Sequence, residues 1–397
     1  MTTAVAENEK VVTLLLLLGR TTFTDDERTL AENTCRSLND WRLFTDLAIR
    51  HGVAALVWQN ITDLGLSSAV PETERAILEG MRFKTIARVS YITTAATEAV
   101  TALENEGIRV LLLKGLALEH SVYGSRGLRQ MSDADLLVAP EDVLRARDIL
   151  VRKGFVSDPM KSSLYRYIIL DLGNHLPELH RSGISIDLHY RLFGPEGTMI
   201  VKRALDDPEV ISAGGRTFFA LPPGTALLGL VNHIFKHEVK GEFQLRLYTD
   251  IYLLLKKHGE GILDEKLMAE ASVAGIEGEM RVVMTIIEKF YGIAVPSAFH
   301  AMEGPGRERV DAFRYQLLDP GAAKPRSPKD IFLENLRSLK GMRRKLIFIT
   351  GDLFPSVEFM KNRYGCRTVL SALLFYPHRL GKLIWIFDII LAKPRVK

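Results

Sequence analysis

The hydrophobic positions divide the chain into three parts. Over residues 1–105, apolar residues recur every three or four positions, as in LNDWRLFTDLAIRHGVAALVWQNI, which is the spacing of amphipathic helices. After Gly107 the pattern changes to short apolar runs bounded by turn residues, which are typical of buried strands. Beyond Pro222 the helical spacing returns, in segments such as TALLGLVNHIFKHEV and LRLYTDIYLLLKKHG. The pattern therefore predicts a strand-containing core between two helical regions.

The central part is predicted to alternate strands and helices. IRVLLL and DADLLV have the composition of buried strands, LALEHSVYG that of a short helix, and EDVLRARDILVRKGF that of an amphipathic helix ending near Gly154. YIILDLGNHLPELHRSGISIDLHYRLF is interpreted as strands linked by tight turns, with Ser182 and Gly183 in a hairpin turn. Along ISIDLHY, strand alternation places Asp187 and His189 on the face opposite the apolar side chains.

The chain is thus expected to be an α+β protein, in which a small mixed-sheet core is embedded in N-terminal and C-terminal helical regions. The expected divisions are an N-terminal helical region (1–105), an α/β core (106–220), a helical substrate-side region (221–300), a linker (301–330) and a basic helical C-terminal region (331–397). The linker, expected to be mobile, is predicted from its Pro-, Gly- and Lys-rich composition.

Composition is that of a soluble globular protein able to bury a core, since 47% of the 397 residues are hydrophobic and 25% are charged. Cys35 and Cys366 are too few for a disulfide framework or a thiolate zinc site, so a reducing cytoplasm is the expected location. The apolar N-terminal stretch follows Glu7 and Glu9 rather than the positive segment of a secretory signal. It is therefore predicted to be a buried first helix.

Charge is unevenly distributed along the chain. Residues 324–397 contain sixteen Lys and Arg and five Asp and Glu, a net charge of +11, which leaves −7 for residues 1–323. This asymmetry favours an anionic partner for the tail, which could be RNA, a membrane surface or the acidic body of the protein itself; a solvated helical face is the simpler alternative. The apolar stretch SALLFYPHRLGKLIWIFDIILAKPRVK is too interrupted by polar residues to span a membrane. Packing against the body is expected, and a peripheral position at the membrane is the alternative.

Two aspartates, Asp133 and Asp135, begin the second predicted strand of the core. Residues two apart on a strand point the same way, so these carboxylates can share a divalent cation while Ala134 faces the core. Carboxylate oxygens suit Mg²⁺, and a third carboxylate from a later strand, such as Asp187, would allow two Mg²⁺ ions to be held. A D-x-D pair alone is common at strand ends and turns. In this context it favours phosphoryl or nucleotidyl transfer.

Several stretches together resemble a known family. VLLLKGLAL, YGSRGLRQMSDADLLVAPEDVLRARDILVRKGF and ELHRSGISIDLHYRLF resemble the uncharacterised bacterial nucleotidyltransferase family of the polymerase-beta-like superfamily, and AIRHGVAALVW, VNHIFKH, LRLYTDIYLLL and LFPSVEFMKNRYG are similar as well. The resemblance implies Mg²⁺, a nucleoside triphosphate, Gly115 in the phosphate-binding turn, Asp133 and Asp135 as the metal pair, and Asp187 as the third carboxylate. Leu116 stands where the superfamily usually has Gly or Ser, and the interval from Gly115 to Asp133 is longer than usual.

Nucleotide-binding residues are expected close to these carboxylates. The start of the LALEH helix favours anions, and nearby cations can neutralise a triphosphate and its developing charge. Arg129 is the first candidate because it lies just before the metal-binding strand. The expected nucleotide-binding residues are Lys114, Gly115, Arg126, Arg129 and Ser132.

Histidines offer a second group of candidates. His233 and His237 lie one helical turn apart, a zinc-compatible spacing, but Ile234 stands where a zincin motif requires Glu, so a metalloprotease is not expected. His189, His237 and Arg246 are predicted to line the substrate side of the cleft. The histidines at 175, 180 and 189 could form a metal cluster, although ordinary hydrogen-bonded strand histidines are more common.

The sequence therefore predicts Mg²⁺-dependent transfer of a nucleoside monophosphate from a nucleoside triphosphate to an unidentified hydroxyl or phosphate acceptor. One alternative is toxin-like modification of an RNA end, which the basic tail favours. Another is a catalytically weak member of the family that serves as a binding or accessory protein, which the Leu116 departure allows.

Overall fold

The computed structural model describes residues 3–171, 173–194, 197–301, 303–319, 321 and 326–382. Its helices are α1 (Thr3–Leu18), α2 (Asp25–Ser37), α3 (Trp41–Arg50), α4 (Ala54–Asp63), α5 (Glu72–Glu104), α6 (Lys114–Ser121), α7 (Val143–Arg152), α8 (Thr198–Asp206), α9 (Pro223–Val239), α10 (Leu245–His258), α11 (Glu265–Val273), α12 (Glu277–Tyr291), α13 (Pro305–Leu318), α14 (Pro328–Ser338), α15 (Met342–Leu353), α16 (Val357–Tyr364), α17 (Val369–Leu373) and α18 (Phe375–Lys382). Its strands are β1 (Leu111–Leu112), β2 (Asp133–Leu137), β3 (Val156–Ser157), β4 (Leu179–Arg181), β5 (Ile184–His189), β6 (Glu209–Ala213) and β7 (Arg216–Ala220).

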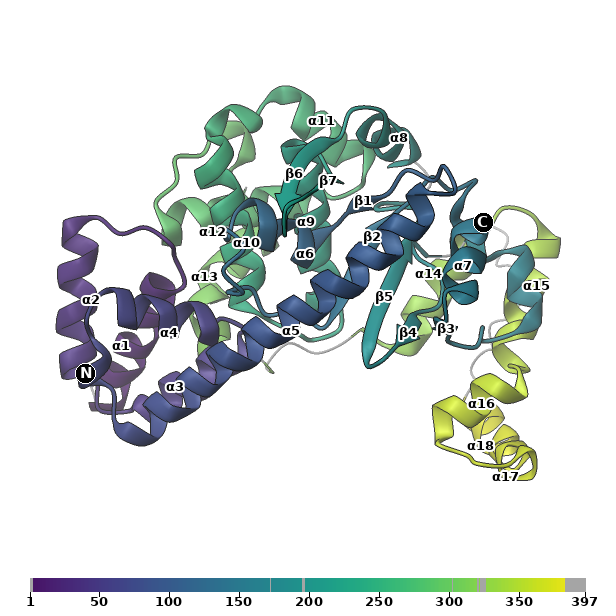
Figure 1. Cartoon of the computed structure of the whole chain (residues 1–397), viewed down its shortest axis with the longest axis horizontal. Helices are drawn as coiled ribbons and strands as arrows, with labels where there is room; N and C mark the ends of the chain where they lie inside the picture. The colour runs from purple at the N-terminus through teal and green to yellow at the C-terminus, as the bar shows by residue number, and fades with distance from the viewer. Residues whose placement is uncertain are drawn as a thin grey trace.

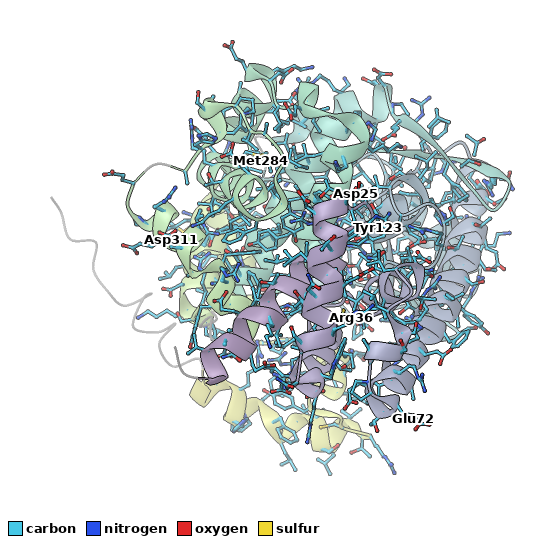
Figure 2. All side chains as sticks on the ribbon, turned by 90° about the vertical axis from the view of Figure 1, so that its left-hand side faces the viewer. Asp25, Arg36, Glu72, Tyr123, Met284 and Asp311 are labelled. Carbon is cyan, nitrogen blue, oxygen red and sulfur yellow. The ribbon has the colours of Figure 1, made fainter. Side chains whose placement is uncertain are left out.

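The N-terminal third is helical, as its apolar spacing predicts. The leucine-rich half of α1 is buried, which agrees with the prediction of a buried first helix. Helix α2 begins at Thr24, whose hydroxyl accepts from the backbone N–H of Glu27 while the Glu27 side chain accepts from the backbone N–H of Thr24. Asp25 and Arg36 lie at opposite ends of α2, where their charges complement the helix dipole (Figure 2).

Helix α5 connects the N-terminal helices to the sheet. It is 33 residues long, and it runs diagonally from the helices around α3 and α4 to the strands (Figure 1). Leu78 in its first half packs into the helical core, whereas Val89, Ile92 and Leu103 pack into the core of the sheet. The helix therefore fixes the position of β2 and β5 relative to the N-terminal region.

The sheet is mixed and has the strand order β3-β4-β5-β2-β1-β7-β6. Strand β2 runs parallel to β5, with Asp135 opposite Asp187, and β1 runs parallel to β7; the other neighbouring pairs are antiparallel. The predicted turn between β4 and β5 is present, because Ser182 and Gly183 both have positive φ angles (50° and 76°). The α+β class predicted from the pattern, with helical regions on either side of the sheet in sequence, is confirmed.

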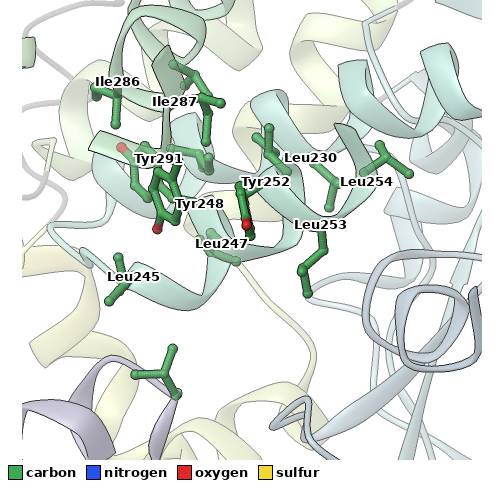
Figure 3. Close-up of a cluster of buried hydrophobic side chains, with 14 of the residues drawn as sticks. Leu230, Leu245, Leu247, Tyr248, Tyr252, Leu253, Leu254, Ile286, Ile287 and Tyr291 are labelled. Atoms are coloured by element: carbon green, nitrogen blue, oxygen red, sulfur yellow. The ribbon is translucent and has the colours of Figure 1, made fainter. Parts of the chain in front are cut away.

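The helices that follow the sheet form a second layer of the core. Side chains of α9, α10 and α12 interdigitate around Tyr248, Tyr252 and Tyr291 (Figure 3). Burying each large apolar side chain contributes about 1.5–3 kcal/mol, so this cluster provides much of the rigidity of the face that carries Asp250 and His233.

The structure corrects two local expectations and adds elements that were not predicted. Residues 167–171, expected in a strand, belong to two 3₁₀ turns (Ser163–Tyr167 and Ile169–Asp171), the first of which is capped by the Ser162 hydroxyl. The hairpin β6–β7, with its turn at Gly214 and Gly215, and helix α8 were not predicted. Within the expected linker, residues 305–318 form α13, whose Val310, Phe313 and Leu317 are buried in the main core.

Helices α14–α18 gather beyond the edge of the sheet formed by β3 and β4, away from the N-terminal helices (Figure 1). Helix α15 packs on the 3₁₀ turn at Ser163–Tyr167, and a small separate core there contains Ile168, Phe332 and Phe348. None of the helices described here combines the length and apolar character needed to cross a bilayer. The C-terminal stretch expected to pack on the body is described only as far as α18; residues 383–397 lie outside the described residues.

Candidate active site

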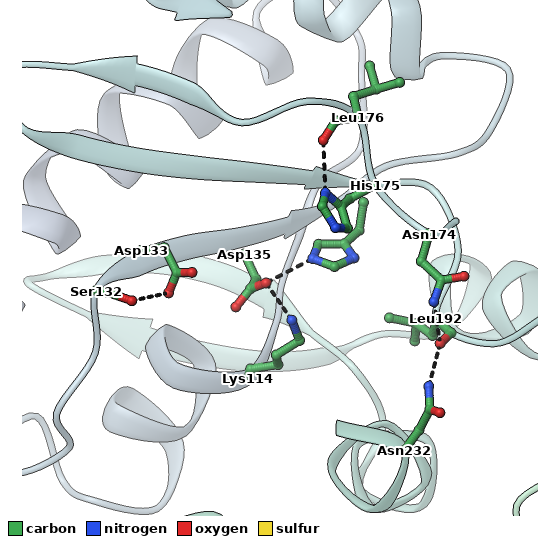
Figure 4. A network of polar contacts seen from close by, with 10 residues as sticks. Lys114, Ser132, Asp133, Asp135, Asn174, His175, Leu176, Leu192 and Asn232 are labelled. Carbon is green, nitrogen blue, oxygen red and sulfur yellow. Dashed lines mark hydrogen bonds and ion pairs between the residues drawn. The ribbon is translucent and has the colours of Figure 1, made fainter. Parts of the chain in front are cut away.

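The three carboxylates predicted to bind metal lie on one face of the sheet. Asp133 and Asp135 point the same way from β2, while Ala134 between them is fully buried, as the alternation predicts (Figure 4). Asp187 lies opposite Asp135 on the neighbouring parallel strand β5. Asp135, Asp187 and His189 each offer a ligand atom, and these atoms lie within 4.8 Å of one another. Asp133 is adjacent but does not belong to this compact group of three.

Asp135 is the most constrained of these carboxylates. Its Oδ1 accepts from Lys114 Nζ at 2.6 Å (Figure 4). The same oxygen accepts from His189 Nε2 at 2.8 Å. Burial opposes ionisation of Asp135, but the charge of Lys114 and the hydrogen bond from His189 outweigh it and hold the pKa of Asp135 well below its usual range. Asp135 is therefore an anion over the whole physiological pH range.

His189 is neutral in this arrangement. Burial, assisted by the charge of Lys114, lowers the pKa of His189 to about 4, although the Asp135 carboxylate works in the opposite direction. Because an ionised carboxylate can only accept, Nε2 carries the proton of the neutral ring and Nδ1 carries a lone pair. That Nδ1 atom is buried and has no hydrogen-bond partner within the described part of the chain.

Asp187 has a carboxylate oxygen whose hydrogen-bonding capacity the described residues leave unsatisfied. Its Oδ1 is buried and accepts no hydrogen bond from any described residue. Burial, together with the charges of Asp135 and Asp133, raises the pKa of Asp187 to about 6, against a lowering effect of His175. Asp133 has a raised pKa for the same reasons, burial first and Asp135 second, although Ser132 Oγ donates to its Oδ1 at 3.3 Å. A divalent cation would satisfy this excess of negative charge, so the donor set fits a Mg²⁺ site.

Arg129, the first candidate for nucleotide binding, is largely engaged inside the protein. Its Nε and Nη2 donate to the two carboxylate oxygens of Asp250 at 2.9 and 2.7 Å, and Tyr123 donates to the same carboxylate at 2.9 Å. Arg129 is 4% exposed and Asp250 is fully buried. The remaining nitrogen, Nη1, lies against Gly115, where a Cβ would overlap it. Gly115 is therefore required for the close approach of the Arg129 guanidinium, whatever its part in phosphate binding.

Glu119 is an organising residue that the sequence analysis missed. Both of its carboxylate oxygens accept from backbone N–H groups, from Gly127 at 2.6 Å, Leu128 at 3.1 Å and Arg129 at 2.8 Å. Glu119 is fully buried, and this burial raises its pKa against the lowering effect of the three donors. An acidic residue between apolar neighbours in LALEH is the signal that could have identified it.

The remaining predicted residues are spread around this centre. Arg126 and Ser132 are exposed on the loop before β2. Arg246 on α10 donates to the backbone carbonyl of Gln130, and burial together with the charge of Arg129 lowers its pKa to about 10. His237 Nδ1 lies 2.6 Å from Glu242 Oε2, at the exposed end of α9. Within the described residues, His237 does not belong to a group of three His, Cys, Asp or Glu side chains placed to share a metal ion.

A small cavity, lined mostly by apolar side chains but with several polar ones, adjoins the centre on the α9 side. It has a volume of about 60 Å³, enough for a few water molecules, and its wall includes Lys114, His189, His233 and Lys236. Burial and the charge of Lys114 lower the pKa of His233 to about 2 and that of Lys236 to about 8. At the rim, Asn174 and Asn232 both donate to the backbone carbonyl of Leu192, at 3.3 and 2.8 Å (Figure 4). The sequence analysis expected only His237 of α9 on the substrate side, and His237 is not among the residues that line this cavity.

The sequence profile of the uncharacterised nucleotidyltransferase family matches residues 37–292, which is more than half of the chain. The chain belongs to this family. The matched range contains the two parallel strands with their carboxylates and the helices α9–α12, and it ends before α13. The stretch LFPSVEFMKNRYG, for which the sequence predicted a similarity to the family, lies outside the matched range. Neither a curated protein nor a solved structure matches the chain significantly.

Proposed function

We propose that this nucleotidyltransferase family member uses Mg²⁺ to transfer a nucleoside monophosphate from a nucleoside triphosphate to an acceptor hydroxyl or phosphate. The observation that carries the proposal is the placement of Asp187 directly opposite Asp135 on parallel strands, with Asp133 on the same face. In this arrangement Asp133, Asp135 and Asp187 would hold two Mg²⁺ ions, which when bound neutralise the triphosphate and stabilise the attacking and leaving oxygens.

The side chains around the carboxylates have distinct parts in this proposal. Lys114 neutralises Asp135 in the absence of other cations, and its 22% exposed side chain can turn to a phosphate oxygen. Arg126 and Ser132 lie on the exposed loop beside Asp133 and are proposed to contact the nucleotide. Arg129 is a positioning residue, because its ion pair with Asp250 holds the loop before β2 against α10.

The transfer step is an in-line displacement. An acceptor oxygen forms a bond to the α-phosphorus, the bond from that phosphorus to the oxygen bridging to the β-phosphate breaks, and pyrophosphate leaves with the bonding electron pair. If the acceptor is a hydroxyl, its proton passes to Asp187 or to solvent. Asp187, whose pKa is about 6, can thus either ligate the second ion or act as the base.

Binding of nucleoside triphosphates tests this proposal. The full-length chain should bind at least one of the four common nucleoside triphosphates in a Mg²⁺-dependent manner. Asp135→Asn should weaken that binding at least ~10-fold, because it replaces a negatively charged metal ligand by a neutral amide. Asp148→Asn, an exposed aspartate on α7, is the matched control and should bind like the parent chain. Equilibrium dialysis with labelled nucleotide measures both. Mg²⁺-independent binding that is equal in the two variants would contradict the proposal.

Modification of an RNA end is the second candidate, because residues 324–397 carry a net charge of +11. Contacts of this kind release counterions, so RNA binding would weaken steeply as salt is raised. An accessory role without turnover is the third reading, supported by Leu116 and by the engagement of Arg129 with Asp250. Mg²⁺-dependent nucleotide binding without pyrophosphate release from any acceptor would favour it.

A further inference from the structure

A large cavity lies between the C-terminal helices and residues 159–177 on the other side, and His175 is part of its wall. Its volume is about 610 Å³, within the range of small-molecule sites and far above that of the small cavity beside Lys114. One part of its wall is aromatic, formed by Tyr165, Phe332 and Phe348. Another part is cationic, formed by Lys161, Arg363 and Arg379.

The two sides of the cavity are fastened to each other. Ser356, just before α16, donates from its backbone N–H to the carbonyl of Lys161 at 2.8 Å and from its hydroxyl to the carbonyl of Met160 at 3.0 Å. The Tyr165 hydroxyl donates to the backbone carbonyl of Phe348 at 3.3 Å. Gly351 lies so close to the Tyr165 ring that a Cβ would overlap it. The cavity is therefore held in shape by specific contacts between its two sides, and the C-terminal helices form one of its walls.

Positive charge inside the cavity exceeds negative charge. Asp352 forms an ion pair with Lys161, and its backbone carbonyl accepts from Arg379 Nε and Nη2 at 3.3 and 2.9 Å. Arg363 forms no ion pair with any residue described here. Burial, and then the charges of Arg379 and Arg363, lower the pKa of Lys161 to about 7. The cavity wall thus carries two arginines, Arg363 and Arg379, besides Lys161 against the single carboxylate of Asp352, and this excess of positive charge suits a phosphate dianion.

His175 connects this cavity to the carboxylates. It belongs to the cavity wall, and its ring centroid lies 5.2 Å from that of His189. A backbone bridge joins the same two residues. The charge of His175 also favours the ionised form of Asp187. A molecule in the cavity can therefore present an atom on the His175 side of the proposed site of transfer.

We propose that this cavity binds the acceptor, and that the acceptor is a small organic molecule carrying a phosphate group and an apolar or aromatic part. The phosphate contacts the Arg363, Arg379 and Lys161 cluster, and the apolar part lies against Tyr165, Phe332 and Phe348. The binding site stands on the cavity alone; its assignment to the acceptor rests on the proposed nucleotidyl transfer.

Phenyl phosphate is the probe, because it combines an aromatic ring with a phosphate. Isothermal titration of the full-length chain, without Mg²⁺ or nucleotide, should detect phenyl phosphate binding, with benzoate weaker and phenol undetectable. Arg363→Gln should weaken phenyl phosphate binding at least ~10-fold, the loss expected for one charge-assisted contact. Arg367→Gln is the matched control, since Arg367 is an exposed arginine four residues further on that does not line the cavity, and it should bind as the parent chain does.

The outcomes separate this inference from the proposed function. Asp135→Asn should retain phenyl phosphate binding while losing Mg²⁺-dependent nucleotide binding, and the parent chain should bind phenyl phosphate and Mg²⁺–nucleotide together. Equal affinity for phenol, or no effect of Arg363→Gln, would overturn the phosphate site. Displacement of phenyl phosphate by the nucleotide would assign the cavity to the donor instead, and Arg363-dependent binding of an RNA end that phenyl phosphate cannot displace would assign it to RNA. Probe binding without any Mg²⁺-dependent nucleotide binding would refute nucleotidyl transfer and, with it, the acceptor assignment.

Discussion

At the scale of single residues, the candidate site combines a carboxylate that has close hydrogen-bond donors, Asp135, with one that has a buried oxygen without a donor, Asp187. Asp135 has two close donors, Lys114 and His189, whereas Asp187 Oδ1 has none among the described residues. Both lie on the same face of adjacent strands. The protein without metal therefore stores electrostatic repulsion at Asp187, and this repulsion should be visible in its stability.

Replacing Asp187 by Asn should stabilise the metal-free protein at about pH 7.5 by about 2 kcal/mol, after allowance for partial exposure. The pKa of Asp187 is raised from 3.8 to about 6, so the native state holds its proton more tightly than the unfolded state does. The parent chain therefore loses stability as the pH rises from about 4 through 6, and the Asn variant does not. Urea unfolding at several pH values measures the difference, which should vanish near pH 4.

Mg²⁺ supplies the control for that experiment. It should stabilise the parent chain and stabilise Asp187→Asn less, because a ligand that binds only the native state shifts unfolding by mass action. Asp148→Asn on the surface of α7 should follow the parent chain at every pH. A stability gain from Asp187→Asn that persists unchanged at pH 4 would show that repulsion at Asp187 is not its cause.

At the scale of elements, the loop between α6 and β2 is held by buried charges at both of its ends. Glu119 accepts hydrogen bonds from the backbone N–H groups of residues 127–129. Arg129 joins the loop to α10 through its ion pair with Asp250.

Glu119→Gln should destabilise the protein by about 2 kcal/mol, because the NH₂ group of the new side chain would face backbone donors instead of an acceptor. Hydrogen exchange should accelerate first at the amides of residues 127–129. Glu141→Gln, at an exposed position, should change neither; uniform acceleration over the whole chain would contradict a local role of Glu119.

The elements also show what the sequence can and cannot predict. Period-two alternation was sufficient to place Asp133, Asp135 and Asp187 on one face, because that pattern is local to each strand. The partner of Arg129 could not be predicted, since Asp250 lies 121 residues away and meets it only through the packing of α10. Helix α13 was mistaken for a linker because the Pro and Gly residues at its start have the composition of one. Its burial could not be predicted either, since it depends on long-range contacts with α12. The side chains that share a face within each strand could be predicted from the sequence. The distant residues that hold the site's side chains in place could not.

At the scale of the whole molecule, the described residues contain three hydrophobic cores of unequal size. The helical body and the sheet have extensive cores, while the core beside the C-terminal helices has five buried members, Ile168, Phe332, Leu339, Phe348 and Leu353. Phe348 is 5% exposed, and its ring lies 5.0 Å from that of Phe332. A core of this size cannot absorb the loss of a large aromatic ring, so the C-terminal helices should be the first part of the fold to open.

Phe348→Ala tests this uneven distribution of stability. Removing the ring should cost about 3 kcal/mol, mostly to the docking of α14–α16 on the segment 159–177. Hydrogen exchange should then accelerate across α14–α18 while amides of α9–α12 keep their protection. Phe354→Ala removes the same side chain at a position that is 56% exposed, and it should leave both sets of amides unchanged. A single transition in which all helices lose protection together would mean that the C-terminal helices fold as one unit with the family core, and that their small core is stabilised by the body rather than separate from it.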